Sequence, residues 1–267
     1  MLSHAKLLAA LAAGFVVSGS ASAAAMVPGF DSHTAVSADQ VISYETIGFP
    51  ILAASPDDII SEQIYISSRG FMSFSISMQS GTHVYMDISP FFDIAGYSGT
   101  MTYGTGTYDG NRAFGVNWVD ISPDPNWFDT ETGTGYTGSE RNNFQLILVD
   151  RSDGAGRATG DFDIIFNYDS IQWDWQGPDF IGFSMLVNNE PDQSERLSFP
   201  HFSVYPGYFH DGQPNALVSN SLNSDVAGRY IFEVHSPIPE PETWVMLLAG
   251  LGIVGAVTRR QRIEAAL

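Results

Sequence analysis

Short apolar runs that alternate with polar residues constrain the fold of this 267-residue chain most strongly. In the run 71–78, Phe74, Ile76 and Met78 fall on one side of an extended strand, and serines fall on the other. A period of two is typical of a strand with one buried face. The body of the chain shows no capped apolar stripe with the 3.6-residue period of a helix. The pattern therefore predicts an all-β protein.

Further runs of this kind follow one another along the body, separated by Gly, Asp and Asn turns. They are Ile64–Ile66, Val84–Ile88, Gly99–Tyr108, Phe114–Ile121, Phe144–Val149, Phe162–Tyr168, Phe180–Val187 and Tyr230–Val234. We expect Gly99–Tyr108, which alternates Thr, Tyr and Gly, to form a twisted, exposed pair of strands, and residues 150–160 to form a hairpin loop. Strands and turns in this order predict an antiparallel β-sandwich-like domain.

The first residues have the three parts of a secretory signal peptide. These are the positive Lys6, the apolar stretch Leu7–Val17, and an A-x-A cleavage site at Ala21 and Ala23. We expect cleavage after Ala23 or after Ala25. Residues 1–23 are then the signal peptide, and residues 24–59 are the lead-in of the exported body. The protein is expected to leave the cytoplasm.

Charge and cysteine content limit the function classes. Without residues 1–23 and the segment after Ile238, the body keeps seven arginines, no lysine and 27 of the 30 acidic residues. Such a negative surface repels a phosphate backbone, which excludes nucleic acid as a partner. The absence of cysteine excludes thiol catalysis, zinc–thiolate sites and iron–sulfur clusters. A domain of this size is stable without disulfides, and a bacterial cell surface is the expected setting.

No nucleophile elbow, H-E-x-x-H motif or Walker loop occurs in the sequence. We therefore expect no catalytic and no cofactor-binding residues, and a non-enzymatic protein. Two weaker patterns stay open. His201 and His210, near Asp211, would suit a metal site or an acid–base pair, although we favour surface loop histidines. Two carboxylates across a cleft would suit glycoside hydrolysis, but no pair stands out.

Aspartates gather in two places. Asp120, Asp124 and Asp129 flank the long irregular segment 122–141, and Asp150, Asp153, Asp161 and Asp163 surround the expected hairpin. Clustered carboxylates in β-loops suit Ca²⁺. The spacing does not match an EF-hand, and aspartate is a common turn residue. We favour the turn role and keep a calcium-stabilised module as an alternative.

Tryptophans in the body have two expected roles. Trp173 and Trp175 share one face of a strand, and Trp173 is expected in the core. Trp127 lies in the long polar segment and is the best candidate for an exposed contact with a sugar.

Five segments, in their order and spacing, resemble the extracellular nidogen-like domain. They are YISSRGFMSFS (65–75), ISPFFDIAG (88–96), NNFQLILVD (142–150), FDIIFNYDSIQWD (162–174) and GRYIFEV (228–234). The nidogen-like domain is therefore placed at residues 60–235. Arg69 and Phe92 stand where the family more often has asparagine and tryptophan. The resemblance implies an extracellular module of cell–matrix adhesion without catalytic residues.

The most specific of these segments also leads to expectations for single residues. We expect Phe166, Tyr168, Ile171 and Trp173 to supply the core of the last long strand and its bend. Asn167 and Asp169 are expected to face solvent or to fix the turn.

The C-terminal residues combine three features in order. They are Pro239, Glu240 and Pro241, the apolar run Trp244–Val257, and the arginines Arg259, Arg260 and Arg262. Residues 236–262 thereby resemble a PEP-CTERM sorting signal, with a transmembrane helix at 244–258 and a cytoplasmic tail at 263–267. As a helix the apolar run is roughly 21 Å long, which is short for a bilayer core of roughly 30 Å and suits a transient anchor. The arginines would hold the tail on the cytoplasmic side.

The sorting signal implies processing by an exosortase-type membrane enzyme in a Gram-negative bacterium that makes exopolysaccharide. We expect an exported cell-surface or extracellular-matrix protein that functions in cell–matrix adhesion or in exopolysaccharide and biofilm association. Its expected partners are an extracellular polysaccharide or a matrix protein, and it contacts the membrane only transiently. The alternatives are a secreted carbohydrate-active enzyme and a calcium-stabilised structural module.

Overall fold

The computed structural model describes residues 24–35, 41–44, 46–52, 56–91, 98–126, 135–174, 181–196 and 207–236. These residues form twelve strands and one short 3₁₀ helix, Pro56–Asp58. The strands are β1 (His33–Ala35), β2 (Val41–Tyr44), β3 (Ile59–Ser67), β4 (Phe71–Met78), β5 (His83–Ser89), β6 (Ser98–Tyr108), β7 (Asn111–Ser122), β8 (Asn142–Asp150), β9 (Phe162–Ser170), β10 (Gly182–Val187), β11 (Glu190–Arg196) and β12 (Arg229–Val234).

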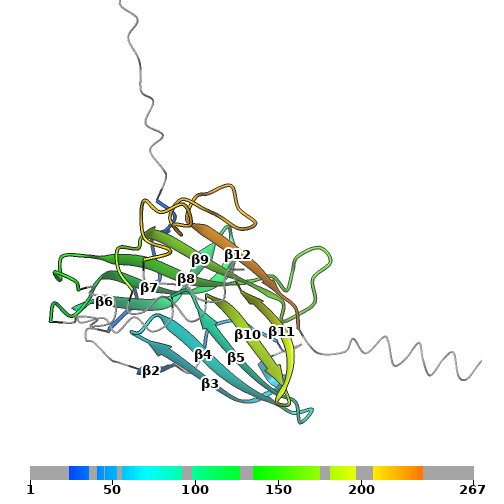
Figure 1. Ribbon diagram of the computed structural model, residues 1–267. Helices are drawn as coiled ribbons and strands as arrows, with labels where there is room; N and C mark the ends of the chain where they lie inside the picture. The colour runs from blue at the N-terminus through cyan, green and yellow to red at the C-terminus, as the bar shows by residue number, and fades with distance from the viewer. Residues whose placement is uncertain are drawn as a thin grey trace, which may run out of the picture.

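The strands form two six-stranded sheets that lie face to face (Figure 1). Sheet A has the order β1-β6-β7-β8-β9-β12, and sheet B has the order β11-β10-β5-β4-β3-β2. Every strand pair within the sheets is antiparallel. Side chains from both sheets share one large apolar core. The structure therefore confirms the all-β, antiparallel sandwich.

The alternation that predicted the fold is visible in β4. Phe74, Ile76 and Met78 are buried against sheet A, and Ser75 and Ser77 between them are partly exposed. The 150–160 segment is also the predicted hairpin loop, because it joins the paired strands β8 and β9.

Sheet A differs, because its central strands are buried on both faces. Residues 25–30, which we call the N-terminal strap, lie across its outer face. Phe30 packs there against Ile147, Val149 and Ile165, forming a second apolar cluster. Glycine makes room for this ring: a Cβ atom on Gly115 would lie 2.4 Å from Phe30. The lead-in thus belongs to the folded body, and it also supplies β1 and β2.

A row of polar side chains crosses this same outer face, with one residue on each of the strands β6, β7, β8, β9 and β12 at matching register. Its members, which we call the polar row, are Thr102, Asn117, Gln145, Asn167 and Arg229. Each side chain donates to the next: Arg229 to Asn167 (2.8 Å), Asn167 to Gln145 (2.8 Å), Gln145 to Asn117 (2.6 Å) and Asn117 to Thr102 (2.9 Å). Gln145 and Asn167 are fully buried. The expected solvent exposure of Asn167 is therefore wrong, because the strap covers this face.

The expected core residues of β9 and its bend are confirmed. Phe166, Ile171 and Trp173 are fully buried, and Tyr168 is 1% exposed. The Trp173 Nε1–H group donates to the Ile121 carbonyl at 2.8 Å. Such bonds satisfy the polar ends of buried aromatic side chains.

Two other details of the strand prediction are corrected. Gly99–Tyr108 is one strand, β6, rather than an exposed pair; it lies between β1 and β7, and Met101 and Tyr103 on it are buried. Three strands were not foreseen, namely β1, β2 and β11, because they are short or rich in polar residues.

Candidate ligand face and tail-anchoring site

The outward face of sheet B is the candidate ligand face. On β3, β4 and β5 the residues between the buried apolar ones point away from the core, and we call them the serine–tyrosine face. They are Gln63, Tyr65, Ser73, Ser75, Ser77, His83, Tyr85 and Asp87. Cross-strand register sets them in rows, one of which runs from Gln63 through Ser75 to Tyr85. Sheet B thereby presents hydroxyl, amide and aromatic groups on a regular surface.

Tyr85 lies at the centre of β5 and is 44% exposed. Among the described residues it is the exposed large hydrophobic side chain. Its hydroxyl donates to Asp87 Oδ1 at 2.8 Å. Partial burial, together with this neighbouring carboxylate, raises the pKa of Tyr85 above its usual value. Burial likewise raises the pKa of Asp87, although the hydrogen bond from Tyr85 opposes the rise.

The hydrogen bond to Asp87 orients the ring of Tyr85. Sugars bind proteins through stacking of their C–H faces on aromatic rings and through hydrogen bonds from their hydroxyl groups. The serine–tyrosine face provides both kinds of contact from rigid strands. The arrangement can therefore hold a flat, hydroxyl-rich ligand.

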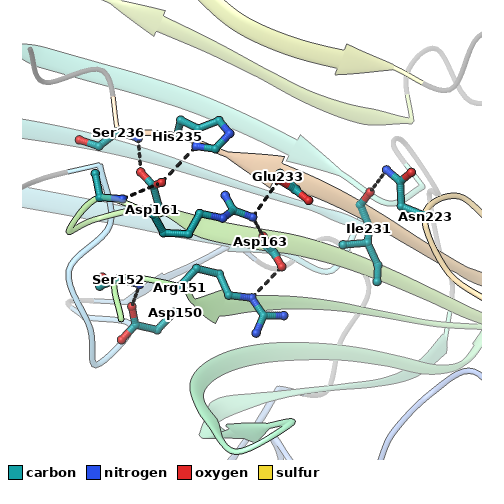
Figure 2. Close-up of polar contacts among 12 residues, drawn as sticks. Asp150, Arg151, Ser152, Asp161, Asp163, Asn223, Ile231, Glu233, His235 and Ser236 are labelled. Atoms are coloured by element: carbon teal, nitrogen blue, oxygen red, sulfur yellow. Dashed lines mark hydrogen bonds and ion pairs between the residues drawn. The ribbon is translucent and has the colours of Figure 1, made fainter. Parts of the chain in front are cut away.

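The tail-anchoring site lies where the domain ends, at His235 and Ser236 (Figure 2). Asp161, at the end of the β8–β9 hairpin loop, binds both residues. The Ser236 N–H donates to Asp161 Oδ1 at 2.8 Å, and the His235 Nδ1 atom lies 3.1 Å from Oδ2. On the other side, Gln193 of β11 accepts from the His235 N–H at 3.2 Å and donates to its carbonyl at 2.6 Å. Both sheets thus hold the last two described residues.

Asp161 is nearly fully buried, with 3% of its side chain exposed. Burial by itself raises its pKa, but hydrogen bonds from the Ser236 N–H, the His235 ring and the Ala158 N–H outweigh burial. The net result is a pKa below the usual value. Asp161 therefore binds the end of the domain as a carboxylate.

Arginines neutralise the other carboxylates of this region. Asp163 lies directly opposite Glu233 in the β9–β12 register, an unfavourable pairing of like charges. The Arg157 NH2 group lies between them, 2.9 Å from Asp163 and 3.0 Å from Glu233. Arg151 adds a second contact with Asp163 at 2.7 Å (Figure 2). The β8–β9 hairpin loop is thereby fastened to β12.

Most aspartates of the predicted group around the hairpin bind arginines or backbone N–H groups of the protein itself. Asp163 and Asp161 are bound as described above, and Asp150 accepts from Arg112 at 2.6 Å. Asp153 is exposed at the loop. Among the described residues, no group of three or more His, Asp or Glu side chains could hold a metal ion. In the second group, Asp124 makes a local turn by accepting from the Asn126 N–H, and Asp129 lies outside the described residues.

His210 is more buried than a surface loop histidine. Its Nε2 atom lies 3.3 Å from Asp174 Oδ2, and the Asp174 side chain is 2% exposed. Asp174 also accepts from the Gly207 N–H at 3.0 Å, so it is bound to two residues of the segment 207–210. The expected partner His201 lies outside the described residues, as do Trp127 and Trp175.

Three features of these sites were not foreseen from the sequence: the Tyr85–Asp87 pair, the contact of Asp161 with His235, and the polar row. A signal for the first was present, because Tyr85 and Asp87 occupy the polar positions of an alternating strand. The other two depend on pairing between distant segments. The expected cleavage site at Ala21 and Ala23 lies outside the described residues. The same is true of Pro239, Glu240 and Pro241, and of Arg259, Arg260 and Arg262.

Comparison with known protein families places this sandwich among extracellular modules. Residues 98–236 match the model of the nidogen-like domain, and residues 237–262 match the PEP-CTERM protein-sorting motif. The first match covers more than half of the chain, so the chain belongs to the nidogen-like domain family. No curated protein and no solved structure gave a significant match.

The sorting motif implies export, sorting to the cell surface and processing by an exosortase-type system. It begins at residue 237, directly after the two residues that Asp161 binds. The described residues contain no helix with the length and apolarity needed to cross a membrane. The predicted helix at 244–258 lies outside those residues.

Proposed function

We propose that this protein is a non-enzymatic module of the cell surface or extracellular matrix that associates with exopolysaccharide in cell–matrix adhesion or biofilm. The cell would be an exopolysaccharide-producing Gram-negative bacterium. The sorting motif and membership of the nidogen-like family support the extracellular setting. The observation that carries the binding role is the serine–tyrosine face, with Tyr85 exposed and oriented by Asp87.

Charge narrows the ligand class within this proposal. The body contains no lysine and far more acidic than basic residues. Its negative potential would repel a polyanionic polymer and would not affect a neutral glycan. The arginines Arg112, Arg151 and Arg157 are moreover engaged with aspartates. A neutral polysaccharide is therefore the ligand that we propose for this face.

The direct test measures binding of the exported full chain to extracellular polysaccharide isolated from the producing cells. In the variant Tyr85→Ala we expect about a tenfold loss of affinity, because truncation of an aromatic anchor typically costs more than 1 kcal/mol. Tyr85→Phe keeps the ring and should retain most of the affinity. Asp153→Asn, which changes an exposed carboxylate on the β8–β9 hairpin loop, is the control and should bind normally.

Three results would count against the proposal. Equal binding by the parent chain and Tyr85→Ala would remove the serine–tyrosine face as the site. Absence of binding to the polysaccharide would remove the proposed ligand. Release of reducing sugar from the polymer during the assay would show an enzyme instead of a binding module.

A further inference from the structure

The start of the N-terminal strap is held by a carboxylate. Asp169, which follows the buried part of β9, accepts from two consecutive backbone amides. The distance from the Ala25 N–H group to Oδ1 is 2.7 Å, and the distance from the Met26 N–H group is 3.0 Å. On the other side, the Arg229 NH2 group donates to the Ala25 carbonyl at 2.8 Å. Nearly all these strap contacts use backbone atoms, so they fix position and direction.

A pocket of about 500 Å³ opens beside these contacts. Ala24 and Asp169 line it, together with Tyr168, Val218 and Ala227. Ala24 is exposed, whereas Ala25 is 2% exposed. The chain therefore passes from an exposed to a buried position between these two alanines, next to a carboxylate.

This transition distinguishes between the two expected cleavage positions. Cleavage after Ala25 would remove the residue whose carbonyl binds Arg229 and whose methyl group fits against Gly228; a Cβ on Gly228 would lie 3.0 Å from it. Cleavage after Ala23 leaves every one of these contacts in place. The structure therefore favours a mature chain that begins at Ala24.

We propose that the pocket at Asp169 is a receptor site for the α-ammonium group of Ala24, created when the signal peptide is removed. A leader peptidase of the exporting cell would hydrolyse the Ala23–Ala24 peptide bond with one water molecule. Ala23 then leaves with a carboxylate, and Ala24 gains an amine that takes up a proton. The proposal rests on the exported state in the proposed function and adds a specific role for leader removal.

The geometry allows the ion pair. Three covalent bonds separate the Ala24 nitrogen from the Ala25 nitrogen, and normal bond angles keep the two atoms about 2.6 to 3.7 Å apart. The Ala25 nitrogen already lies 2.7 Å from Asp169 Oδ1. Opposite charges within about 4–6 Å favour each other's ionised state.

Arg229 is a second charged group that contacts this end of the chain. It binds the carbonyl of Ala25, on the side of that residue away from the Ala24 nitrogen. It is also bound to Asn167. The positive charge of Arg229 disfavours a charged α-ammonium group. The test therefore measures how much the pKa of the α-amine changes when the Asp169 charge is removed.

The amino-acid composition makes this group easy to observe. The one lysine of the chain, Lys6, lies in the signal peptide. A mature chain that begins at Ala24 therefore contains a single primary amine. Reductive methylation with ¹³C-formaldehyde labels that amine alone and keeps its positive charge.

The experiment uses the full chain, exported with its own signal peptide and purified in detergent. N-terminal sequencing first identifies the mature start, which we expect at Ala24. The pKa of the labelled α-amine is then measured by NMR in the parent chain, in Asp169→Asn and in the charge-matched control Asp153→Asn. Asp169→Asn should lower this pKa by about half a unit, as expected for an exposed ion pair. Asp153→Asn should not change it.

The outcomes are distinct. A mature start at Met26, or equal α-amine pKa values in Asp169→Asn and Asp153→Asn, would overturn the proposal. If Asp169→Asn does not fold, the comparison is between the folded and the urea-unfolded parent chain in low and high salt. A salt-dependent rise of the pKa on folding supports the ion pair, and no rise contradicts it. No polysaccharide is present in the assay, so its failure is separate from failure of the proposed ligand.

Discussion

The two ends of the folded body are held by different kinds of contact. At the N-terminal end, the strap packs on the outer face of sheet A. Phe30 is 4% exposed there, and side chains of the polar row bind the backbone of the strap. At the C-terminal end, His235 is largely exposed, and Asp161 and Gln193 hold it by a few polar contacts. Beyond the Asp169 and Arg229 contacts at Ala25, the first end is packed like a core, whereas the second end is held by polar contacts at the surface.

This difference suits the two ends to different tasks. Burial of apolar surface does not depend on the ionisation of any group, so the part of the strap around Phe30 should stay in place as the pH changes. Contacts to a carboxylate depend on its ionisation, so the C-terminal attachment should weaken in acid. The sorting motif begins at this second, weaker attachment.

The largest effect should come from Phe30→Ala. Loss of this ring from the cluster with Ile147 and Ile165 should lower the free energy of unfolding by about 3 kcal/mol, in the usual range for a buried phenylalanine. The same truncation at the other end, His235→Ala, should cost less than about 1 kcal/mol. Urea denaturation of both variants measures the difference. Equal losses would break the contrast between the two ends.

Much of this architecture could be predicted from the sequence. In β4, for example, the alternation of apolar and polar residues matches the alternation of buried and partly exposed side chains. The burial of Phe74 and Ile76 could be predicted without knowledge of the tertiary structure, because both residues lie on the apolar face of β4. The same local reasoning failed for Asn167. Its outward position was correctly inferred from the alternation, but the strap that covers it comes from a segment about 140 residues earlier.

The candidate sites divide in the same way. Tyr85 and Asp87 occupy neighbouring outward positions on one strand, so their contact follows from local spacing. Asp161 and His235 are brought together only because β9 pairs with β12. Sequence spacing alone grouped Asp161 with nearby aspartates, for which we favoured a turn role and kept calcium binding as the alternative. In the structure, Arg151 and Arg157 of the hairpin loop bind its neighbour Asp163, and pairing of β9 with β12 brings the chain end to Asp161 itself.

An intermediate effect is expected from Gln145→Leu. The side-chain volume is nearly kept, but the Val27 N–H, Asn117 and Asn167 lose their partner in a buried place. Unsatisfied buried groups typically cost 1–3 kcal/mol, so we expect a loss of about 2 kcal/mol. Hydrogen exchange should accelerate at the Val27 amide.

Gln63→Leu on the exposed face of sheet B is the matched control for this substitution. Its side chain is exposed and accepts from the Tyr65 hydroxyl. Its free energy of unfolding should change by less than about 0.5 kcal/mol. If both glutamine variants were equally stable, the polar row would be a passive surface and not a means of holding the strap.

A smaller effect than that of Gln145→Leu is expected from Asp161→Asn, and this variant separates the two ends by their chemistry. The pKa of Asp161 is lowered in the folded state, so its carboxylate stabilises the fold above the unfolded value of 3.8. That contribution is lost as the pH falls through the folded pKa. Asp161→Asn should therefore cost about 1 kcal/mol at pH 6 and much less at an acidic pH below the folded pKa. Denaturation at both pH values, with Asp153→Asn as control, measures this change. An equal cost at both values would mean that shape and not charge holds the C-terminal end.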